Sequence, residues 1–127
     1  MYDHHRKTIN NISEKLNNRD DVLALIIGGS IAHGFEAENS DVDIMILLSN
    51  ENYKIRFNSG DLHYWENECC TYSDGYIDGK YISVEFLNKV AENGSEPARF
   101  AFDGAIIAFS KLDNLQELIN KVTRYPI

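Results

Sequence analysis

Hydrophobic and polar residues follow two patterns in the first part of the chain. Residues 3–18 carry apolar side chains three and four positions apart, which predicts an amphipathic helix lying on a larger structure. Residues 22–27 form an unbroken apolar run, and residues 41–48 form a second one apart from two aspartates. Short apolar runs are typical of strands that are covered on both faces. We therefore expect two central strands, joined through a turn, a short helix and a loop.

The rest of the chain predicts further strands and helices. Residues 50–75 are polar with interspersed aromatic rings, which favours irregular strands or a hairpin with turns at residues 59–61 and 73–75. The later expected elements are a strand over residues 76–82, a helix over 84–93 between Ser83 and Gly94, a helical turn behind Ser95, a tight turn at Asp103-Gly104, a strand over 105–109, and a helix from Leu112 to near Tyr125-Pro126.

These elements predict an α/β (α+β) fold, with a mixed β-sheet of about four to five strands flanked by helices. The length of 127 residues suits a single domain over residues 1–127. Because the sequence stops directly after its last predicted helix, it could also be the N-terminal part of a longer protein.

Charge and composition narrow the classes of function. The 12 Lys and Arg residues are outnumbered by 20 Asp and Glu residues, which gives a net charge of −8. The cations are scattered, so we expect no binding to long nucleic acid, although a small nucleotide carrying Mg²⁺ is compatible with the charge. No run approaches the ~20 apolar residues of a membrane span, and no secretion signal is evident, which favours a cytoplasmic protein. Cys69 and Cys70 are adjacent and fit neither a disulfide framework nor a zinc site.

Two carboxylates mark the second predicted strand. Asp41 and Asp43 are two residues apart, so a strand places both on one face. Paired anions beside an apolar strand are costly unless a cation or hydrogen-bond donors compensate them. A divalent metal is the simplest compensation, since Mg²⁺ prefers oxygen ligands and two-metal sites of this kind catalyse phosphoryl-type displacements.

A glycine-rich turn precedes that strand. Gly28, Gly29 and Ser30 follow the first buried strand and open a short helical stretch, where glycines allow backbone N–H groups to approach an anion. The spacing matches neither a P-loop nor a dinucleotide-binding motif. Ten residues separate Ser30 from Asp41, which is enough for one helix and a return to the neighbouring strand. We therefore expect a phosphate-binding turn and the carboxylate pair at the same end of the sheet.

Together the two motifs resemble the signature of the polymerase-β-like nucleotidyltransferase superfamily. That signature is h-G-[GS]-S, followed after roughly ten residues by D-h-[DE]-h, where h is an apolar residue. The matching segments are Ile27-Gly28-Gly29-Ser30 and Asp41-Val42-Asp43-Ile44. Residues 29–43 are most similar to a small bacterial and archaeal branch of the superfamily. His33 departs from the arginine usual in that branch, which leaves the role of this side chain open.

The resemblance implies a sheet of the nucleotidyltransferase type and a third carboxylate on a later strand. Asp78 lies in a predicted strand, whereas Glu85 falls in the first turn of a predicted helix, where an acid is favoured by the helix dipole alone. We favour Asp78 and keep Glu85 as the alternative. Lys80 would share the face of Asp78, where it could meet a phosphate or form an ordinary salt bridge.

The resemblance also implies an activity. The protein would be a Mg²⁺-dependent enzyme that moves a nucleoside monophosphate from an NTP, with ATP the expected donor, to a hydroxyl group, releasing pyrophosphate. Asp41, Asp43 and Asp78 would hold two Mg²⁺ ions with the bound NTP, Asp78 would help deprotonate the acceptor, and Gly28, Gly29 and Ser30 would bind phosphates. Acidity argues against nucleic-acid ends as acceptors and leaves a small molecule or a protein side chain.

The alternative is an interaction protein, similar to small antitoxin-type relatives that neutralise a helical partner toxin by binding or nucleotidylating it. Consumption of a metal-bound NTP separates the two hypotheses. A helical partner protein or domain is compatible with both, since acceptor selection in the superfamily often resides in an added helical domain. Among the remaining residues we expect His4, His5 and His63 at the surface or in packing, Tyr64 and Trp65 in core or lid packing rather than base stacking, and Arg99 on a helix surface.

Overall fold

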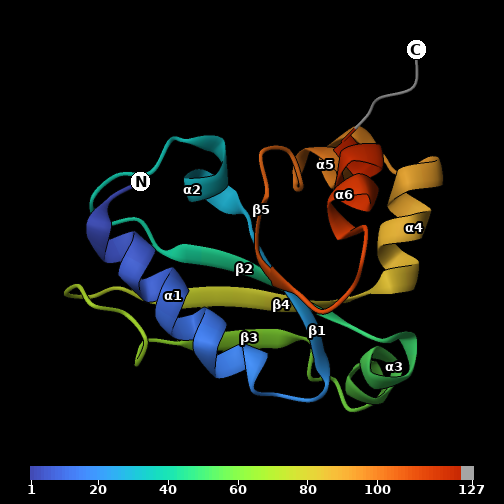
Figure 1. The fold of residues 1–127 in the computed structure, drawn as a ribbon, viewed down its shortest axis with the longest axis horizontal. Coiled ribbons are helices and arrows are strands. Elements are labelled where there is room, and N and C mark those ends of the chain that lie inside the picture. Colours follow the sequence, from blue (N-terminus) through green and yellow to red (C-terminus); the bar gives the residue numbers. More distant parts are fainter. Residues whose placement is uncertain (124–127) are drawn as a thin grey trace.

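The computed structural model describes residues 1–123 and contains one five-stranded sheet flanked by helices (Figure 1). The helices are α1 (Asp3–Asn17), α2 (Gly29–His33), α3 (Asn50–Asn58), α4 (Val84–Asn93), α5 (Glu96–Phe100) and α6 (Leu115–Thr123). The strands are β1 (Val22–Ile27), β2 (Val42–Leu48), β3 (His63–Glu66), β4 (Ile77–Ser83) and β5 (Ile106–Ser110). The predicted end of the last helix near Tyr125-Pro126 lies outside the described residues.

The strand order of the sheet is β3-β4-β2-β1-β5. β1 pairs antiparallel with both β2 and β5, β2 pairs parallel with β4, and β3 pairs antiparallel with β4. The sheet is therefore mixed, as predicted, and β1 and β2 are interior strands. α2 lies in the connection between them, while α3 and β3 lie in the crossover from β2 to β4.

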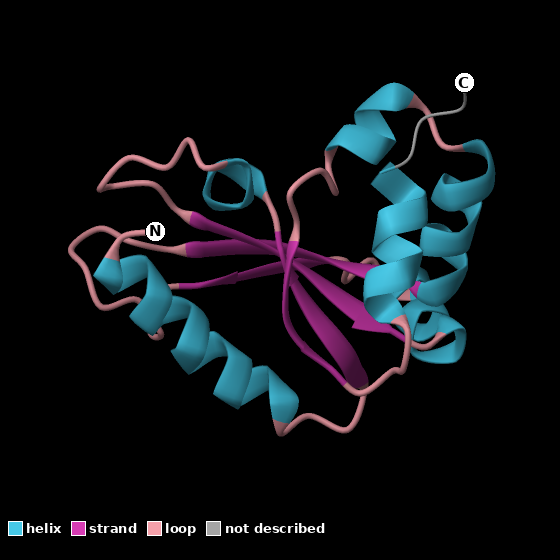
Figure 2. Ribbon diagram, turned by 45° about the horizontal axis from the view of Figure 1, so that its top comes forward, coloured by secondary structure: helices cyan, strands magenta, loops and turns pink. Residues whose placement is uncertain are grey.

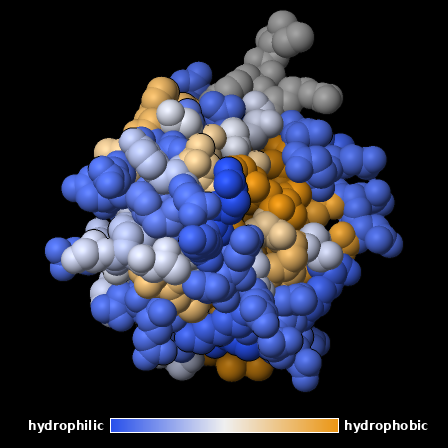
Figure 3. All heavy atoms as spheres, turned by 60° about the vertical axis from the view of Figure 1, so that its left-hand side comes forward, coloured by the Kyte–Doolittle hydropathy of each residue, from blue (hydrophilic) through white to orange (hydrophobic). Residues whose placement is uncertain are grey.

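Helices cover both faces of the sheet (Figure 2). On one face α1 contributes Ile9, Ile12 and Leu16 to a core with alternate residues of β1, β2 and β4. On the other face the remaining residues of these strands pack against α4, α6 and Phe102. This double coverage explains why β1 and β2 are apolar almost throughout. Hydrophilic side chains predominate on the surface shown in Figure 3.

Serine caps set the starts of three helices. The Oγ atoms of Ser49, Ser83 and Ser95 accept hydrogen bonds from the backbone N–H groups of the first turns of α3, α4 and α5. α4 has the predicted bounds and is followed by Gly94, which has extended backbone. None of the helices in the described part of the chain is long and apolar enough to cross a membrane.

The expectation of irregular strands or a hairpin is wrong for residues 50–58, which form α3. No residue of α3 is buried, and its apolar side chains do not gather on one face, so the helical periodicity is missing from the sequence. The Ser49 cap, whose Oγ lies 3.2 Å from the backbone nitrogen of Asn52, is the signal that was available. The turns near Gly60 and Asp74 form as predicted, and both residues have positive φ angles.

Arg99 is also placed differently from the prediction. It is only 2% exposed, not at a helix surface. Its guanidinium donates hydrogen bonds to backbone carbonyls near the ends of α4 and α6, namely those of Ala91, Gly94, Lys121 and Val122. Helix C-termini leave carbonyls unsatisfied, and Arg99 therefore ties two of them together. The sequence around residue 99 could not reveal this, because the partners are set by packing.

Candidate active site

The parallel pairing of β2 and β4 brings two carboxylates side by side. Asp43 on β2 is in register with Asp78 on β4. Asp41 lies one residue before β2 begins, although the predicted strand started at residue 41. One carboxylate oxygen of each aspartate lies within 4.8 Å of the others. Three carboxylates from two separate parts of the chain thus form one acidic cluster.

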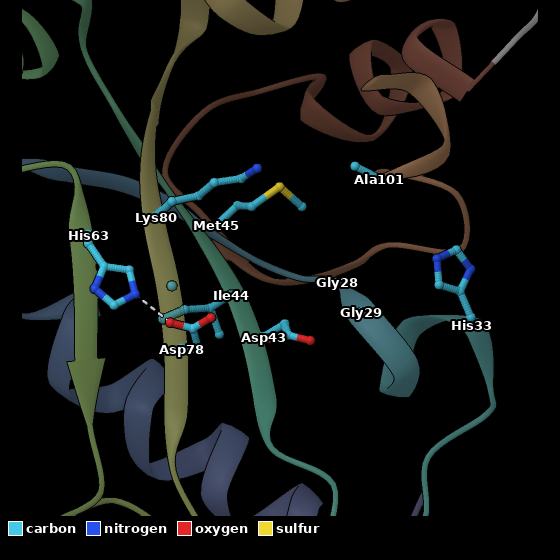
Figure 4. Close-up of a pocket in the computed structure, with 11 residues that line it drawn as sticks. Gly28, Gly29, His33, Asp43, Ile44, Met45, His63, Asp78, Lys80 and Ala101 are labelled. Carbon is cyan, nitrogen blue, oxygen red and sulfur yellow. Dashed lines mark hydrogen bonds and ion pairs between the residues drawn. The ribbon is translucent and has the colours of Figure 1, made fainter. Parts of the chain in front are cut away.

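The cluster borders a pocket of about 360 Å³ (Figure 4). Gly28 and Gly29 form one side of it, Asp43 and Asp78 lie across its floor, and Lys80 and His63 come from the neighbouring strands. Ser30 follows in α2 but does not line the pocket, and Asp41 belongs to the cluster without lining the pocket. The glycine turn and the carboxylates therefore meet at the same end of the sheet.

Close packing explains why glycine occupies position 29. Its φ of +64° is in the left-handed region, and a Cβ atom there would lie 2.0 Å from Oδ2 of Asp43. Any side chain would therefore displace the carboxylate. The backbone N–H of Gly28 also donates to the carbonyl oxygen of Asp43, at 2.9 Å. These contacts hold the start of α2 directly against the acidic cluster.

The electrostatics of the cluster favour a cation. Burial, and then the charges of Asp41 and Asp78, raise the pKa of Asp43 to about 6. The charge of Asp41 raises the pKa of Tyr76 as well. Hard divalent cations bind carboxylate oxygens and relieve the repulsion between neighbouring carboxylates, so the donor set fits Mg²⁺ or a similar ion. Asp41, Asp43 and Asp78 are the residues that could hold it.

We expect the metal-free protein to become more stable as the pH falls from 7 towards 4, through the contribution of Asp43. Its folded-state pKa lies above the ordinary value of 3.8, so the folded state binds the proton more tightly than the unfolded state in this window. Urea unfolding at pH 5 and pH 7 measures the effect. Asp43→Asn should flatten this part of the pH dependence, and an unchanged profile in the variant would contradict the assignment.

His63 lies at the surface, as expected, but it also contacts the acidic cluster, which the sequence did not predict. Its Nε2 atom donates to Oδ1 of Asp78 at 2.5 Å. The antiparallel pairing of β3 with β4 places His63 opposite Lys80 and Trp65 opposite Asp78, on the pocket side of the sheet. The sequence favoured irregular strands or a hairpin in this region but not the register with β4, so it carried no signal for this contact.

Two aromatic groups flank the cluster. Trp65 is 55% exposed and stacks against Tyr76 with ring centroids 6.2 Å apart. Of the two expected roles, core packing is therefore wrong for Trp65, and lid packing stays a prediction. The hydroxyl of Tyr64 instead donates to Glu66. On the opposite side of the pocket, His33 stacks on Phe100 with ring centroids 4.6 Å apart. His33, which stands where the resembling branch usually has arginine, thus has its imidazole ring held at the pocket wall.

The two candidates for the third carboxylate lie at opposite ends of β4. Asp78 belongs to the acidic cluster, whereas Glu85 lies in the first turn of α4, where its carboxylate pairs with Lys89 at 3.0 Å. Lys80 lines the pocket and forms no ion pair with any residue in the described range 1–123. The structure thus brings Asp78, and not Glu85, to the other two aspartates.

Comparison with known proteins connects this geometry to a family. Residues 10–70 match the family model described as "Polymerase beta, Nucleotidyltransferase". No curated protein matches the chain. The matched segment contains the glycine turn and both Asp41 and Asp43, while Asp78 lies beyond it. This match supports the resemblance to the polymerase-β-like nucleotidyltransferase superfamily, and the mixed sheet and the acidic cluster are consistent with it.

Proposed function

We propose that the protein is a Mg²⁺-dependent nucleotidyltransferase that moves a nucleoside monophosphate from an NTP to a hydroxyl acceptor and releases pyrophosphate. ATP is the expected donor, and a small molecule or a protein side chain is the expected acceptor. The observation that carries the proposal is the convergence of Asp41, Asp43 and Asp78 within 4.8 Å, next to a glycine-lined pocket, in a chain whose residues 10–70 match the nucleotidyltransferase family model.

The three aspartates would hold the metal ions. Asp41 and Asp43 would bind both ions together with the NTP, and Asp78 would complete one of the two sites. When bound, such ions neutralise charge on the transferred phosphoryl group and stabilise the attacking and leaving oxygens. Although the pKa of Asp43 is raised to about 6, it still lies below 7, so the carboxylate is largely ionised at pH 7 and can bind a cation.

The glycine turn and Lys80 would bind the phosphates. Gly28 and Gly29 line the pocket, and the Ser30 hydroxyl follows them in α2. Lys80 reaches the same pocket and has no anionic partner in the described chain to hold it back. A negatively charged ligand in the pocket would supply that partner.

Asp78 would accept the proton of the attacking hydroxyl. The acceptor oxygen forms a bond to the α-phosphorus, the bond to the pyrophosphate oxygen breaks, and the hydroxyl proton passes to a carboxylate oxygen of Asp78. His63 donates to Oδ1 of this carboxylate, which fixes its orientation and leaves Oδ2 for other contacts. Because Asp78 is in register with Asp43 on the neighbouring strand, the base would lie next to the residues that hold the metal ions.

The first test is whether metal and nucleotide bind together. Mg²⁺ and ATP added together should raise the melting temperature by more than the sum of their separate effects, because the phosphates complete the metal coordination that the aspartates begin. A ligand at a hundred times its Kd stabilises the folded state by about 2.7 kcal/mol. Incubation with each labelled NTP, Mg²⁺ and cell lysate then shows which molecule gains the label.

Removing the charges of Asp41 and Asp43 should abolish the stabilisation by Mg²⁺ with ATP and leave the fold intact. Asp41→Asn combined with Asp43→Asn relieves repulsion between like charges, so the metal-free double variant should melt no lower than the wild type. Its melting temperature should no longer respond to Mg²⁺ with ATP. A strongly destabilised metal-free variant, or purely additive shifts with all four NTPs in the wild type, would count against the proposal.

A further inference from the structure

Asp41 is the member of the acidic cluster that the sheet does not hold. Asp43 and Asp78 lie inside β2 and β4 and are fixed by register, whereas Asp41 precedes β2. The first sheet-like hydrogen bond after it runs from the N–H of Val42 to the carbonyl of Tyr76, at 3.1 Å. Because the three carboxylates repel one another, the segment carrying Asp41 would move away unless other contacts held it.

Two side chains converge on the carbonyl oxygen of Ser40, directly before Asp41. The hydroxyl of Tyr72 donates to it at 2.6 Å, and Nε2 of His5 lies 2.8 Å from it. A carbonyl oxygen can only accept, so Nε2 of His5 carries a hydrogen. One backbone oxygen thus receives hydrogen bonds from α1 and from the loop between β3 and β4.

His5 makes this contact at a cost to stability. The residue is fully buried, and its Nδ1 atom has no hydrogen-bond partner in the described part of the chain. An unpartnered buried polar atom destabilises the folded state, so packing alone would favour an apolar residue here. The ring lies edge-on to Tyr72, with centroids 5.1 Å apart, which holds the two donors together.

A further contact ties the segment before Asp41 to α1. Nε2 of His4 lies 2.6 Å from the carbonyl oxygen of Glu38, and the ring of His4 packs against Tyr72 with centroids 4.6 Å apart. The segment that leads from α2 into β2 is therefore anchored twice on the first turn of α1. Neither contact touches the pocket itself.

We propose that His5 and Tyr72 are positioning residues for Asp41: by holding the Ser40 carbonyl, they keep the Asp41 carboxylate in the metal-binding cluster. This inference rests on the proposed function, because it assigns these side chains a role in metal binding. Neither residue touches substrate or metal. Their effect passes through one backbone oxygen to the neighbouring residue.

Mn²⁺, used in place of Mg²⁺, provides a direct test, since the paramagnetic signal of the free ion measures binding without any turnover. Tyr72→Phe removes only the hydroxyl that reaches Ser40 and should weaken Mn²⁺ binding by roughly 10–100-fold, the usual effect of losing an outer contact to a ligand. Tyr64→Phe is the matched control, because it removes a hydroxyl that bonds to Glu66 and should leave Mn²⁺ affinity unchanged.

A double-mutant cycle separates positioning from general loosening of the fold. In an Asp41→Asn background, Tyr72→Phe should have no further effect on Mn²⁺ binding, because its route to the metal runs through Asp41. His5→Gln, which keeps an N–H donor, should bind Mn²⁺ more tightly than His5→Leu. Equal Mn²⁺ affinity in the wild type and Tyr72→Phe, or full additivity in the cycle, overturns the inference. Absence of Mn²⁺ binding by the wild type would instead overturn the proposed function.

Discussion

Asp78→Asn is expected to reduce nucleotidyl transfer by roughly 10²–10⁴-fold, the scale of losing a positioned base or charge stabiliser. The substitution keeps the shape of the side chain but removes the carboxylate that lies in register with Asp43. Binding of the nucleotide through Asp41, Asp43 and the glycine turn should largely survive. Release of pyrophosphate from labelled NTP measures transfer, and the melting temperature with Mg²⁺ and ATP measures binding.

Glu85→Gln is the matched control for that result. Glu85 lies beyond the opposite end of β4, in the first turn of α4, where it interacts with Lys89 and the helix dipole. Its loss should cost only about 0.3–1 kcal/mol of stability and leave the transfer rate nearly unchanged. An inactive Glu85→Gln protein beside a normal Asp78→Asn protein would move the third carboxylate to Glu85. If neither variant affected transfer, the base would have to be found elsewhere.

Arg99→Met should produce the largest loss of stability among single substitutions outside the acidic cluster, about 3–5 kcal/mol. The guanidinium donates to four backbone carbonyls near the ends of α4 and α6, and methionine would remove these donors from one buried and three partly buried hydrogen bonds. For a domain of this size, the loss corresponds to a fall in melting temperature on the order of 10–20 °C. Thermal and urea unfolding measure it.

Two further variants test the reason for this loss. Arg99→Lys keeps the charge but cannot donate from a planar fork to several carbonyls at once, so it should also be clearly destabilised. Arg6→Met, at an exposed position of α1, removes an arginine without such partners and should change stability by no more than about 0.5 kcal/mol. Comparable stability of Arg99→Met and Arg6→Met would contradict the capping role of Arg99.

Most of the fold followed from local patterns. The apolar runs of β1 and β2 and the serine caps of α4 and α5 mark these elements within a few residues, because the physical cause of each lies in adjacent positions. α3 escaped prediction because it packs no apolar face against the sheet, so its helical period left no trace in the sequence. β3 lies in the stretch where irregular strands or a hairpin were expected, but its bounds and register did not follow from the sequence, because only four residues form it and one of them is buried.

The same distinction divides the candidate site. The sequence by itself determined the pairing of Asp41 with Asp43 and the glycine turn before them, because their spacing within one strand–helix–strand segment places them together. Only the tertiary structure showed that Asp78, and not Glu85, lies beside the other two aspartates and that His63 contacts Asp78, since both depend on strand register between distant segments. The contacts of His5 and Tyr72 with Ser40 join residues more than 30 positions apart, and no local pattern encodes such a meeting.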